Sequence, residues 1–237
     1  MEGRVIKPVA VMRTDFPAKF GIPRQSGLVA ELCGKIVFTP EYRQAEALRG
    51  IEEFSHLWIL WDFSEARQER FVPTVFPPRL GGRKKRGVFA TRAPFRPNSI
   101  GLSCVKLDEV RTDGEEGPVL YVSGVDLLDG TPIYDIKPYL PYADAHPEAR
   151  GGFGQAHSGD AVEVIFPEEL LCRLPEEKRK AALGVLAQDP RAAYNKRPDY
   201  VYGMEFAGYD IRFTAADGKL TVCGVVDKSR ENWEKVK

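Results

Sequence analysis

Short runs of β-branched and aromatic residues, separated by glycine, proline and Asp-Gly pairs, fill residues 1–140. Runs of this length and composition predict β-strands, and the residues between them predict tight turns. The segments do not alternate with helical patterns, so a doubly wound α/β sheet is disfavoured and a small barrel or sandwich is expected. The predicted strands are 4–12, 28–32, 35–38, 54–63, 88–91, 103–110, 119–125 and 133–136.

The run from Phe54 to Phe63, F-S-H-L-W-I-L-W-D-F, is the most apolar of these segments. It is too apolar for a half-exposed strand and fits one buried on both faces, although a short buried helix would show the same pattern. His56 lies within it. A lone histidine on an apolar strand is more often a packed residue than a base, so His56 is the weaker catalytic candidate.

A polar, glycine-containing stretch over residues 142–160 separates this first part of the chain from a second. In the second part, Pro167-Glu168-Glu169 is typical of a helix N-terminus, where proline and acidic residues are favoured, and Asp189-Pro190 ends the helix. Ala216-Asp217-Gly218 has the composition of a hairpin turn. Strands are predicted over 161–166, 200–206, 209–214 and 220–225.

These patterns predict a mainly β protein of the α+β class. A small, non-Rossmann β-barrel domain is expected over residues 1–141, then a linker over 142–160 and a smaller α+β domain over 161–237. A length of 237 residues fits one to two domains, and 43% hydrophobic residues are enough to fill their cores without disulfide or metal staples.

Charge and cysteine content exclude several classes of protein. Lys and Arg together number 34, as do Asp and Glu, which excludes a protein that holds nucleic acid by bulk charge alone. The four cysteines form no C-x-x-C pair and no Cys/His cluster, so no metal is expected. The sequence shows no signal-peptide core and no apolar run of membrane-spanning length. We therefore expect a cytoplasmic protein with reduced thiols and no membrane partner.

One segment departs from this neutral balance. A local cationic field suits the phosphates of a polyanion and would give a salt-dependent affinity. A solvated loop held clear of the core would show the same composition. The segment between Arg79 and Arg96 has no acidic residue and seven basic ones, namely Arg79, Arg83, Lys84, Lys85, Arg86, Arg92 and Arg96.

Two loops and one strand end carry polar side chains suited to a ligand. Pro23-Arg24-Gln25, between two glycines, presents a guanidinium and an amide from a proline-fixed loop. Phe95-Arg96-Pro97-Asn98 is a second rigid turn rich in donors. Asp126, Asp129 and Asp135 lie in apolar surroundings, where carboxylates need cationic or hydrogen-bonding partners. A purely structural Arg–Asp network would have the same sequence.

Familiar nucleotide and hydrolase motifs are absent from the chain. There is no G-x-x-x-x-G-K-[ST], no G-x-S-x-G, and no G-x-G-x-x-G after a strand. A Rossmann-type site for a nucleotide or a methyl donor is therefore not supported.

Six motifs nevertheless follow one another in a characteristic order. They are P-R-Q at 23–25, F-S-H-L-W-I-L at 54–60, P-P-R-L-G-G at 77–82, G-V-F-A-T-R at 87–92, F-R-P-N-S-I-G-L-S at 95–103 and D-L-L-D-G-T-P-I-Y-D-I-K-P-Y-L-P at 126–141. Over residues 1–141 the chain thereby resembles the TrmO (TsaA, YaeB) family of tRNA methyltransferases. The stretch V-L-A-Q-D-P-R-A-A-Y at 185–194 resembles the C-terminal extension of its full-length bacterial branch.

The resemblance implies a homodimeric β-barrel enzyme that uses S-adenosylmethionine, without a metal, to methylate N6 of N6-threonylcarbamoyladenosine beside the anticodon of tRNA. At Ser64, Glu65 and Cys104 it implies contacts through the backbone. By position, the contacts to the methyl donor would fall on Pro23, Arg24, Gln25, Ser64, Glu65, Arg92, Cys104, Val125, Asp126, Leu127 and Leu128.

The implied reaction needs alignment and a way to remove a proton. A urea nitrogen is a poor nucleophile until its proton is lost, and a nearby cation would stabilise the developing anion. Arg24, Arg92 and Arg96 are the candidate cations, and Asp129 or Asp135 is the candidate proton acceptor. For docking of tRNA, phosphate contacts are expected from Arg83, Lys84, Lys85 and Arg86.

The sequence is also compatible with three other hypotheses about function. A non-catalytic RNA-binding barrel would use the same cationic loop and exposed aromatic residues. A metal-free nucleotide hydrolase would use the carboxylates of Asp126, Asp129 and Asp135 as acid and base. The same fold with a different modified nucleoside or a small molecule as substrate would also keep these motifs.

Overall fold

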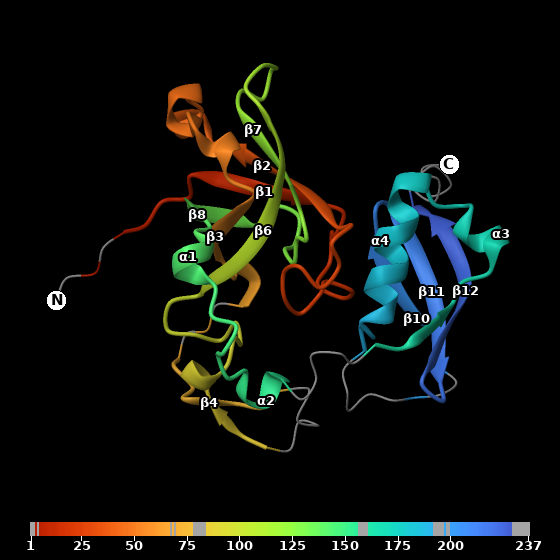
Figure 1. The fold of residues 1–237 in the computed structure, drawn as a ribbon. Helices are drawn as coiled ribbons and strands as arrows, with labels where there is room; N and C mark the ends of the chain where they lie inside the picture. Colours follow the sequence, from red (N-terminus) through yellow and green to blue (C-terminus); the bar gives the residue numbers. More distant parts are fainter. Residues whose placement is uncertain are drawn as a thin grey trace.

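The computed structural model describes residues 3, 5–66, 68, 70–77, 84–155, 161–191, 197 and 200–228. Two bodies of β-structure make up most of the fold, a closed barrel formed by the first part of the chain and a four-stranded sheet formed by the second (Figure 1). A two-stranded ribbon of β4 (Thr74–Val75) and β5 (Arg86–Gly87) lies in a long connection of the first part.

The barrel closes in the order β1-β2-β7-β6-β3-β8, and all neighbouring strands are antiparallel. The predicted fold class, mainly β with a non-Rossmann barrel, is therefore confirmed. The barrel strands are β1 (Ala10–Thr14), β2 (Cys33–Phe38), β3 (His56–Asp62), β6 (Ile100–Arg111), β7 (Val119–Ser123) and β8 (Pro132–Pro138).

Side chains alternate between the interior and the outside of the barrel, as the two-residue period of a strand requires. On β3, Leu57, Ile59 and Trp61 are buried in the interior, whereas the residues between them are only half-buried. The expectation that this strand is buried on both faces was therefore wrong. Trp58 accounts for the error, because this apolar residue lies on the outer face, beside Tyr139 at a ring-centroid distance of 5.6 Å.

Because every pairing is antiparallel, three connections meet at one end of the barrel. They are residues 15–32 after β1, residues 63–99 between β3 and β6, and residues 124–131 between β7 and β8. The opposite end carries residues 39–55, 112–118 and the chain that follows β8. The P-R-Q, F-R-P-N and D-L-L-D motifs lie in these three connections and therefore at the same end of the barrel.

The remaining elements of the first part are short. Four of the 3₁₀ helices are η1 (Pro40–Tyr42), η2 (Ala45–Leu48), η3 (Ile51–Glu53) and η4 (Ser64–Ala66). A further one, η6 (Val88–Ala90), follows β5 directly. Two single-turn helices, α1 (Pro141–Asp144) and α2 (Gly152–Gln155), lie in the stretch that the sequence marks as a linker.

The second part packs the helices α3 and α4 against a sheet of order β10-β11-β12-β9, in which β9 runs parallel to β12. Asp217 and Gly218 both have positive φ, 50° and 76°, which is the geometry of the predicted tight hairpin. The elements are β9 (Glu163–Ile165), α3 (Glu168–Leu171), α4 (Glu176–Ala187), β10 (Tyr202–Phe206), β11 (Tyr209–Ala216) and β12 (Lys219–Asp227). Among the helices described, none is long and apolar enough to cross a bilayer.

Three predicted strands of the first part differ from the structure. The strand predicted over 4–12 begins only at Ala10, after Pro8, which has no N–H to donate to a ladder. Residues 28–32 form turns, and residues 88–90 form the 3₁₀ helix η6. Val29 and Leu32 are apolar because they are buried in the core of the second part, and Val88 is buried at 1% exposure within its 3₁₀ turn.

Candidate functional site

The ladder between β6 and β7 is interrupted where β7 ends, and we call this interruption, with the loops that meet there, the notch. Pairing of β6 with β7 begins at Lys106, opposite Ser123, so residues 100–105 of β6 pair in the ladder with β3 alone. The chain leaves the sheet at Gly124, whose φ of 75° is one that glycine adopts without strain. Gly27 donates its N–H to Gly124 O at 2.8 Å. A Cβ on Gly124 would lie only 3.3 Å from Gly27.

Residues from two connections meet at the exposed edge of β6. Cys104 donates its backbone N–H to the Ser26 hydroxyl at 3.1 Å, which ties the loop of residues 23–27 to the strand. On the same edge, the Ser103 hydroxyl donates to Asp126 Oδ1 at 2.6 Å. The structure therefore brings together three segments that were predicted to contact the methyl donor, namely residues 23–25, Cys104 and residues 125–128.

The hydrogen bonds of Ser103 have a defined direction. Trp61 donates its indole N–H to Ser103 Oγ at 3.0 Å, and an indole nitrogen is only a donor. The serine oxygen is thus the acceptor, and its hydrogen points to Asp126. The side chains of Trp61 and Ser103 are 8% and 1% exposed, so the network links the barrel core to the notch.

Asp126 is the carboxyl group of the notch, and it is electrostatically unusual. Burial raises its pKa from 3.8 to about 6, against the opposing effects of the Ser103 hydroxyl, nearby backbone N–H groups including that of Ser26, and the charge of Arg92. The pKa of about 6 means that at neutral pH this carboxylate is mostly ionised but poorly solvated, as is typical of functional sites.

The loop side chains form a polar rim around this carboxylate. Pro23 is buried and Arg24 is exposed. Arg92 donates to the side-chain oxygen of Gln25, and the Gln25 amide nitrogen donates in turn to Arg24 O. Two predicted contributors, the P-R-Q loop and Arg92, thus make direct contact although they are far apart in the sequence.

Three other residues predicted to contact the methyl donor, Val125, Leu127 and Leu128, are held in place by packing and by backbone hydrogen bonds. Val125 and Leu127 are 3% and 1% exposed and pack into the barrel core. Leu128 O accepts hydrogen bonds from the N–H and the hydroxyl of Thr131, which closes the turn before β8. The Val125 N–H donates to Leu32 O at 3.2 Å, and Leu127 O accepts from the Thr14 hydroxyl at 3.0 Å, so these backbone groups also bond within the protein.

Ser64 and Glu65 lie in η4, which follows β3 at the same end of the barrel. Lys19 joins this helix to the loop after β1, because its ammonium donates to Glu65 O at 3.0 Å and lies 3.2 Å from the Glu65 carboxylate. Among the described residues, no hydrogen bond or ion pair of Ser64 or Glu65 reaches Asp126 or the loop of residues 23–27. Ser64 and Glu65 therefore lie at the same end of the barrel as the notch, in a separate connection.

The predicted catalytic side chains are not all brought together. Arg96 donates to Val88 O and Thr91 O, at 3.2 and 2.9 Å, and so holds the connection in shape. Asp129 accepts from Thr14 N at 3.0 Å and pairs with Arg13 at 3.4 Å. Arg96 is thus bonded within its own connection and Asp129 to the end of β1, and none of these contacts reaches Asp126.

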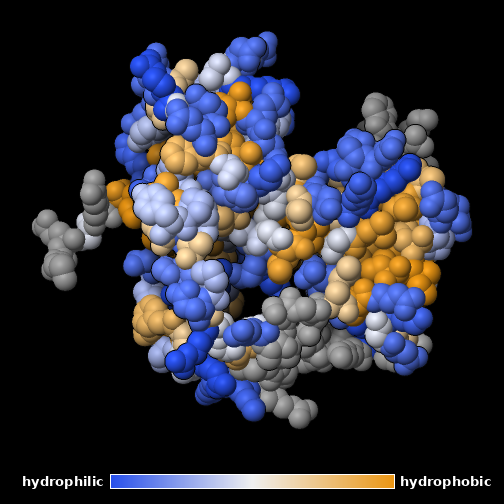
Figure 2. All heavy atoms as spheres, viewed as in Figure 1, coloured by the Kyte–Doolittle hydropathy of each residue, from blue (hydrophilic) through white to orange (hydrophobic). Residues whose placement is uncertain are grey.

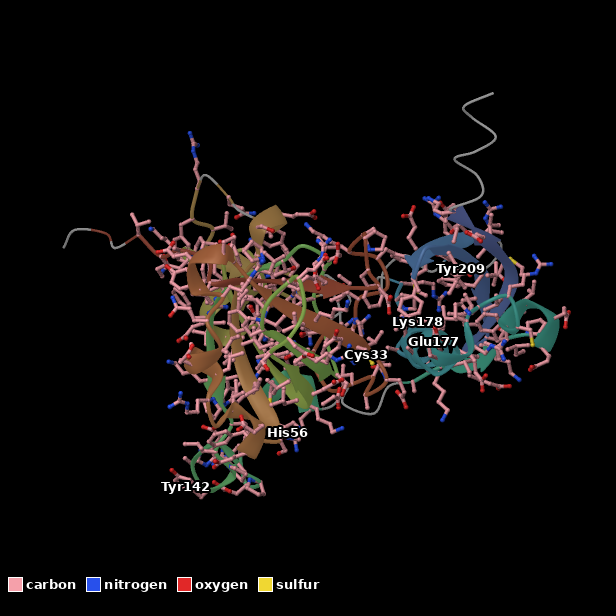
Figure 3. The ribbon with its side chains drawn as sticks, turned by 90° about the horizontal axis from the view of Figure 1, so that it is seen from above. Cys33, His56, Tyr142, Glu177, Lys178 and Tyr209 are labelled. Atoms are coloured by element: carbon pink, nitrogen blue, oxygen red, sulfur yellow. The ribbon has the colours of Figure 1, made fainter. Side chains whose placement is uncertain are left out.

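Asp135 and His56 lie away from the notch. Asp135 is on the outer face of β8, opposite Leu60, and forms an ion pair with Lys137 at 2.8 Å. His56 begins β3 at the opposite end of the barrel, and Figure 3 shows it far from Lys178 and the second part of the chain. The structure therefore does not bring either residue together with Asp126.

The cationic connection reaches solvent beside exposed aromatic rings. Of the four predicted phosphate contacts, Arg83 lies outside the described residues, and Lys84, Lys85 and Arg86 are exposed. Phe71 and Phe89 stack at 6.2 Å, and Phe89 is 72% exposed. Sequence reasoning missed these rings. The available signal was two phenylalanines in a connection without a hydrophobic period.

The residues present fit S-adenosylmethionine. A sulfonium needs a carboxylate, a methionine carboxylate needs a cation, and an adenine needs peptide groups beside an apolar surface. Asp126 and Arg92 supply the two charged partners beside residues 100–105 of β6, which have no ladder partner in β7. Within the described residues, no three His, Cys, Asp or Glu side chains gather as metal ligands would.

A closed antiparallel barrel whose connections gather polar groups at one end defines a non-Rossmann barrel fold with a candidate ligand site. Two models of protein-family domains match this chain and identify the family. The model for the tRNA-methyltransferase O N-terminal domain matches residues 11–145, and the model for the TrmO C-terminal domain matches residues 160–228. The chain belongs to the TrmO family.

Individual relatives are similar over nearly the whole chain. A tRNA (adenine(37)-N6)-methyltransferase of Escherichia coli K12 is 41% identical over 90% of this chain and 94% of its own. A putative S-adenosylmethionine-dependent methyltransferase, RcsF, of Pseudomonas aeruginosa PAO1 is 42% identical over 88% of this chain and 91% of its own. A crystal structure of TrmO from P. aeruginosa, 35% identical, superimposes with a TM-score of 0.76 over 96% of this chain and 98% of that one.

Proposed function

We propose that this chain is an S-adenosylmethionine-dependent methyltransferase that modifies N6 of adenine 37 in tRNA, as its relatives are named to do. The proposed acceptor is N6-threonylcarbamoyladenosine. The observation that carries the proposal is the convergence of the P-R-Q loop, Arg92 and Asp126 on one edge of β6 in a chain of this family.

S-adenosylmethionine supplies an electrophilic methyl group on a positively charged sulfur. The ionised Asp126 carboxylate attracts that charge from within a poorly solvated notch, where Coulomb interactions are strong. Arg92, which donates to the Gln25 side chain, faces carboxylate groups of the two substrates. Val125 O and the N–H groups of Leu127 and Leu128 are the backbone groups that we propose to bind the nucleoside.

The acceptor nitrogen must lose a proton as it attacks the methyl carbon. Asp126 is the carboxyl group best suited to take it, because a pKa of about 6 is close to the working pH of a general base. Asp129 acts as a positioning residue in this proposal, since its carboxylate holds Thr14 N and Arg13 at the end of β1. Arg96 plays a similar part by fixing the carbonyls of Val88 and Thr91.

The proposed function is tested by transfer of a labelled methyl group from S-adenosylmethionine to tRNA that carries N6-threonylcarbamoyladenosine. Stoichiometric label in that nucleoside supports the proposal. Binding of tRNA without transfer, and without affinity for the donor, would support the non-catalytic RNA-binding alternative. Transfer to tRNA with unmodified adenine alone would keep the enzyme and reject the proposed acceptor.

Neutralising the exposed cations Lys84, Lys85 and Arg86 together by alanine is expected to flatten the salt dependence of tRNA binding. Each lost phosphate contact lowers the slope of log K against log salt by about 0.7–0.9, so the slope should fall by about 2. A matched triple alanine variant at Lys106, Arg111 and Lys137, exposed on the barrel, is expected to leave the slope unchanged. Equal slopes for wild type and the first variant would move the tRNA footprint elsewhere.

We also propose a homodimer in the cytoplasm, the compartment in which a tRNA-modifying enzyme meets its substrate. Exposed apolar side chains such as Leu102, 50% exposed on β6, offer surface for a second copy. Sedimentation is expected to give twice the chain mass of 26.5 kDa at micromolar concentration. Sedimentation at the chain mass at that concentration would reject the dimer.

A further inference from the structure

The loop that carries Pro23-Arg24-Gln25 shares its core with the second part of the chain. Phe16, Val29 and Leu32 of this loop are 2%, 3% and 2% exposed, and they belong to one hydrophobic cluster with α4 and β10–β12. Figure 2 shows apolar residues gathered on the second part and at its junction with the barrel. In Figure 1 the loop after β1 reaches out of the barrel towards α4.

The packing at this junction is close enough to need small residues on one side. A Cβ on Gly184 of α4 would lie 2.6 Å from a methyl group of Val29. The Phe16 ring packs on Phe206 of β10 at 5.2 Å. Both ends of the loop, Phe16 near its start and Val29 near its end, are therefore fixed by the second part of the chain.

Polar contacts fix the start of the same loop. Lys178 of α4 forms an ion pair with Asp15 at 2.6 Å, with side chains only 27% and 20% exposed. Ala207 donates its backbone N–H to Asp15 O at 2.9 Å. Figure 3 shows Lys178 on the side of the second part that faces Cys33 and the barrel.

Arg24 itself reaches the second part. Its Nη2 lies 3.4 Å from both Asp189 O and Arg191 O. Those carbonyls are held in place, because Arg191 is 8% exposed, pairs with Asp189 at 2.8 Å and donates to Ala215 O at 3.3 Å. The guanidinium of the P-R-Q motif is thus oriented by two backbone carbonyls that belong to the other domain.

We propose that the C-terminal domain is a positioning element of the methyl-donor site, and that it holds residues 15–32 in the conformation that binds S-adenosylmethionine. Lys178 and Arg191 are positioning residues, since they act through Asp15 and Arg24. Linkage then requires that donor binding strengthen the docking of the domain, because each favours the same loop conformation. This inference rests on the proposed function.

A charge swap at the junction tests the inference. Asp15→Lys and Lys178→Asp as single changes are expected to weaken donor binding about tenfold, whereas the double change is expected to restore it to within about threefold of wild type. The same swap at Lys219 and Glu163, an exposed pair 3.0 Å apart that joins β12 to β9, is the control and is expected to leave the affinity unchanged. Affinity is measured by calorimetry without tRNA.

Outcomes for the inference and for the proposed function are distinct. If the wild type and the single variants bind S-adenosylmethionine equally well, the positioning role is overturned. The proposed enzymatic function is not affected by that result. Wild type that does not bind the donor would overturn the proposed function. Single variants with lowered thermal stability but unchanged affinity would also reject the inference, because a merely structural contact behaves in that way.

A second measurement needs no variant. Donor binding to the wild-type protein is expected to slow hydrogen exchange of the Ala207 N–H, which reports on the contact with Asp15. The Val222 N–H of β12, in the sheet interior, is the reference for global unfolding. Slowing at Ala207 beyond that at Val222 supports the linkage. Equal effects at the two sites contradict it.

Discussion

Asp126→Asn is expected to weaken the binding of S-adenosylmethionine strongly. At the same time it is expected to raise the free energy of unfolding above pH 6. Loss of the carboxylate removes the partner of a cation in a poorly solvated notch, which typically costs about 2–5 kcal/mol, or at least about 30-fold in affinity. The Ser103 hydrogen bond is retained, because the asparagine oxygen still accepts from the hydroxyl. A variant that binds the donor like wild type would contradict the assigned role.

The stability effect follows from the raised pKa. Because Asp126 has a pKa of about 6 in the folded protein and 3.8 as the ordinary value, the folded state binds this proton more tightly. Its contribution to stability is therefore present at low pH and is lost as pH rises from about 4 through 6. The gap of about two pKa units corresponds to about 3 kcal/mol, so Asp126→Asn should gain about 2–3 kcal/mol relative to wild type between pH 4 and pH 7.

Urea unfolding of both proteins at a series of pH values measures this gain. Asp135→Asn is the matched control, because Asp135 is exposed on the outer face of β8 and paired with Lys137. It is expected to show no comparable gain. Donor affinity of wild type should also rise as pH increases through about 6, whereas that of Asp126→Asn should stay flat over the same range.

Arg92→Met is expected to lower kcat/KM by about 100- to 1000-fold, the usual effect of removing one preorganised charge partner of a transition state. Arg92 is the cation whose charge lowers the pKa of Asp126, and it contacts Gln25 of the P-R-Q motif. Arg92→Lys should recover part of the loss, since the charge remains but the forked donor geometry does not.

The control for this change is Arg111→Met, at the opposite end of the same barrel. Arg111 is exposed and forms an ion pair with Glu109 at 2.6 Å. Steady-state kinetics with labelled donor compare the two variants at equal folded concentration. Equal losses in both would mean that Arg92 acts through the general charge of the barrel and not through the notch.

Hydrophobic patterning predicted the barrel well where strands pack against their own neighbours. Segments 103–110, 119–125 and 133–136 all lie within or beside observed strands. The pattern wrongly predicted a strand over residues 28–32, because Val29 and Leu32 are buried in the hydrophobic core of the second part of the chain. It failed again at Val88, which anchors a 3₁₀ turn. One-dimensional patterns record that a residue is buried but not which element buries it.

For the site, the sequence supplied the residues but not their arrangement. The P-R-Q loop and residues 125–128 were predicted to share a donor only through the family resemblance. Their meeting depends on the early end of β7 at Gly124 and on the Gly27–Gly124 hydrogen bond, neither of which has a local sequence signal. The raised pKa of Asp126 likewise depends on burial by distant segments, whereas neighbours in sequence would suggest an ordinary exposed turn.

A crystal structure with S-adenosylmethionine bound is the most direct test of the notch as the donor site. The expected result is a sulfonium within about 4–6 Å of the Asp126 carboxylate, with Arg92 and the P-R-Q loop in contact with the same molecule. A donor bound at the opposite end of the barrel, for example in the hollow between Leu48, Glu52 and Val110, would contradict the account.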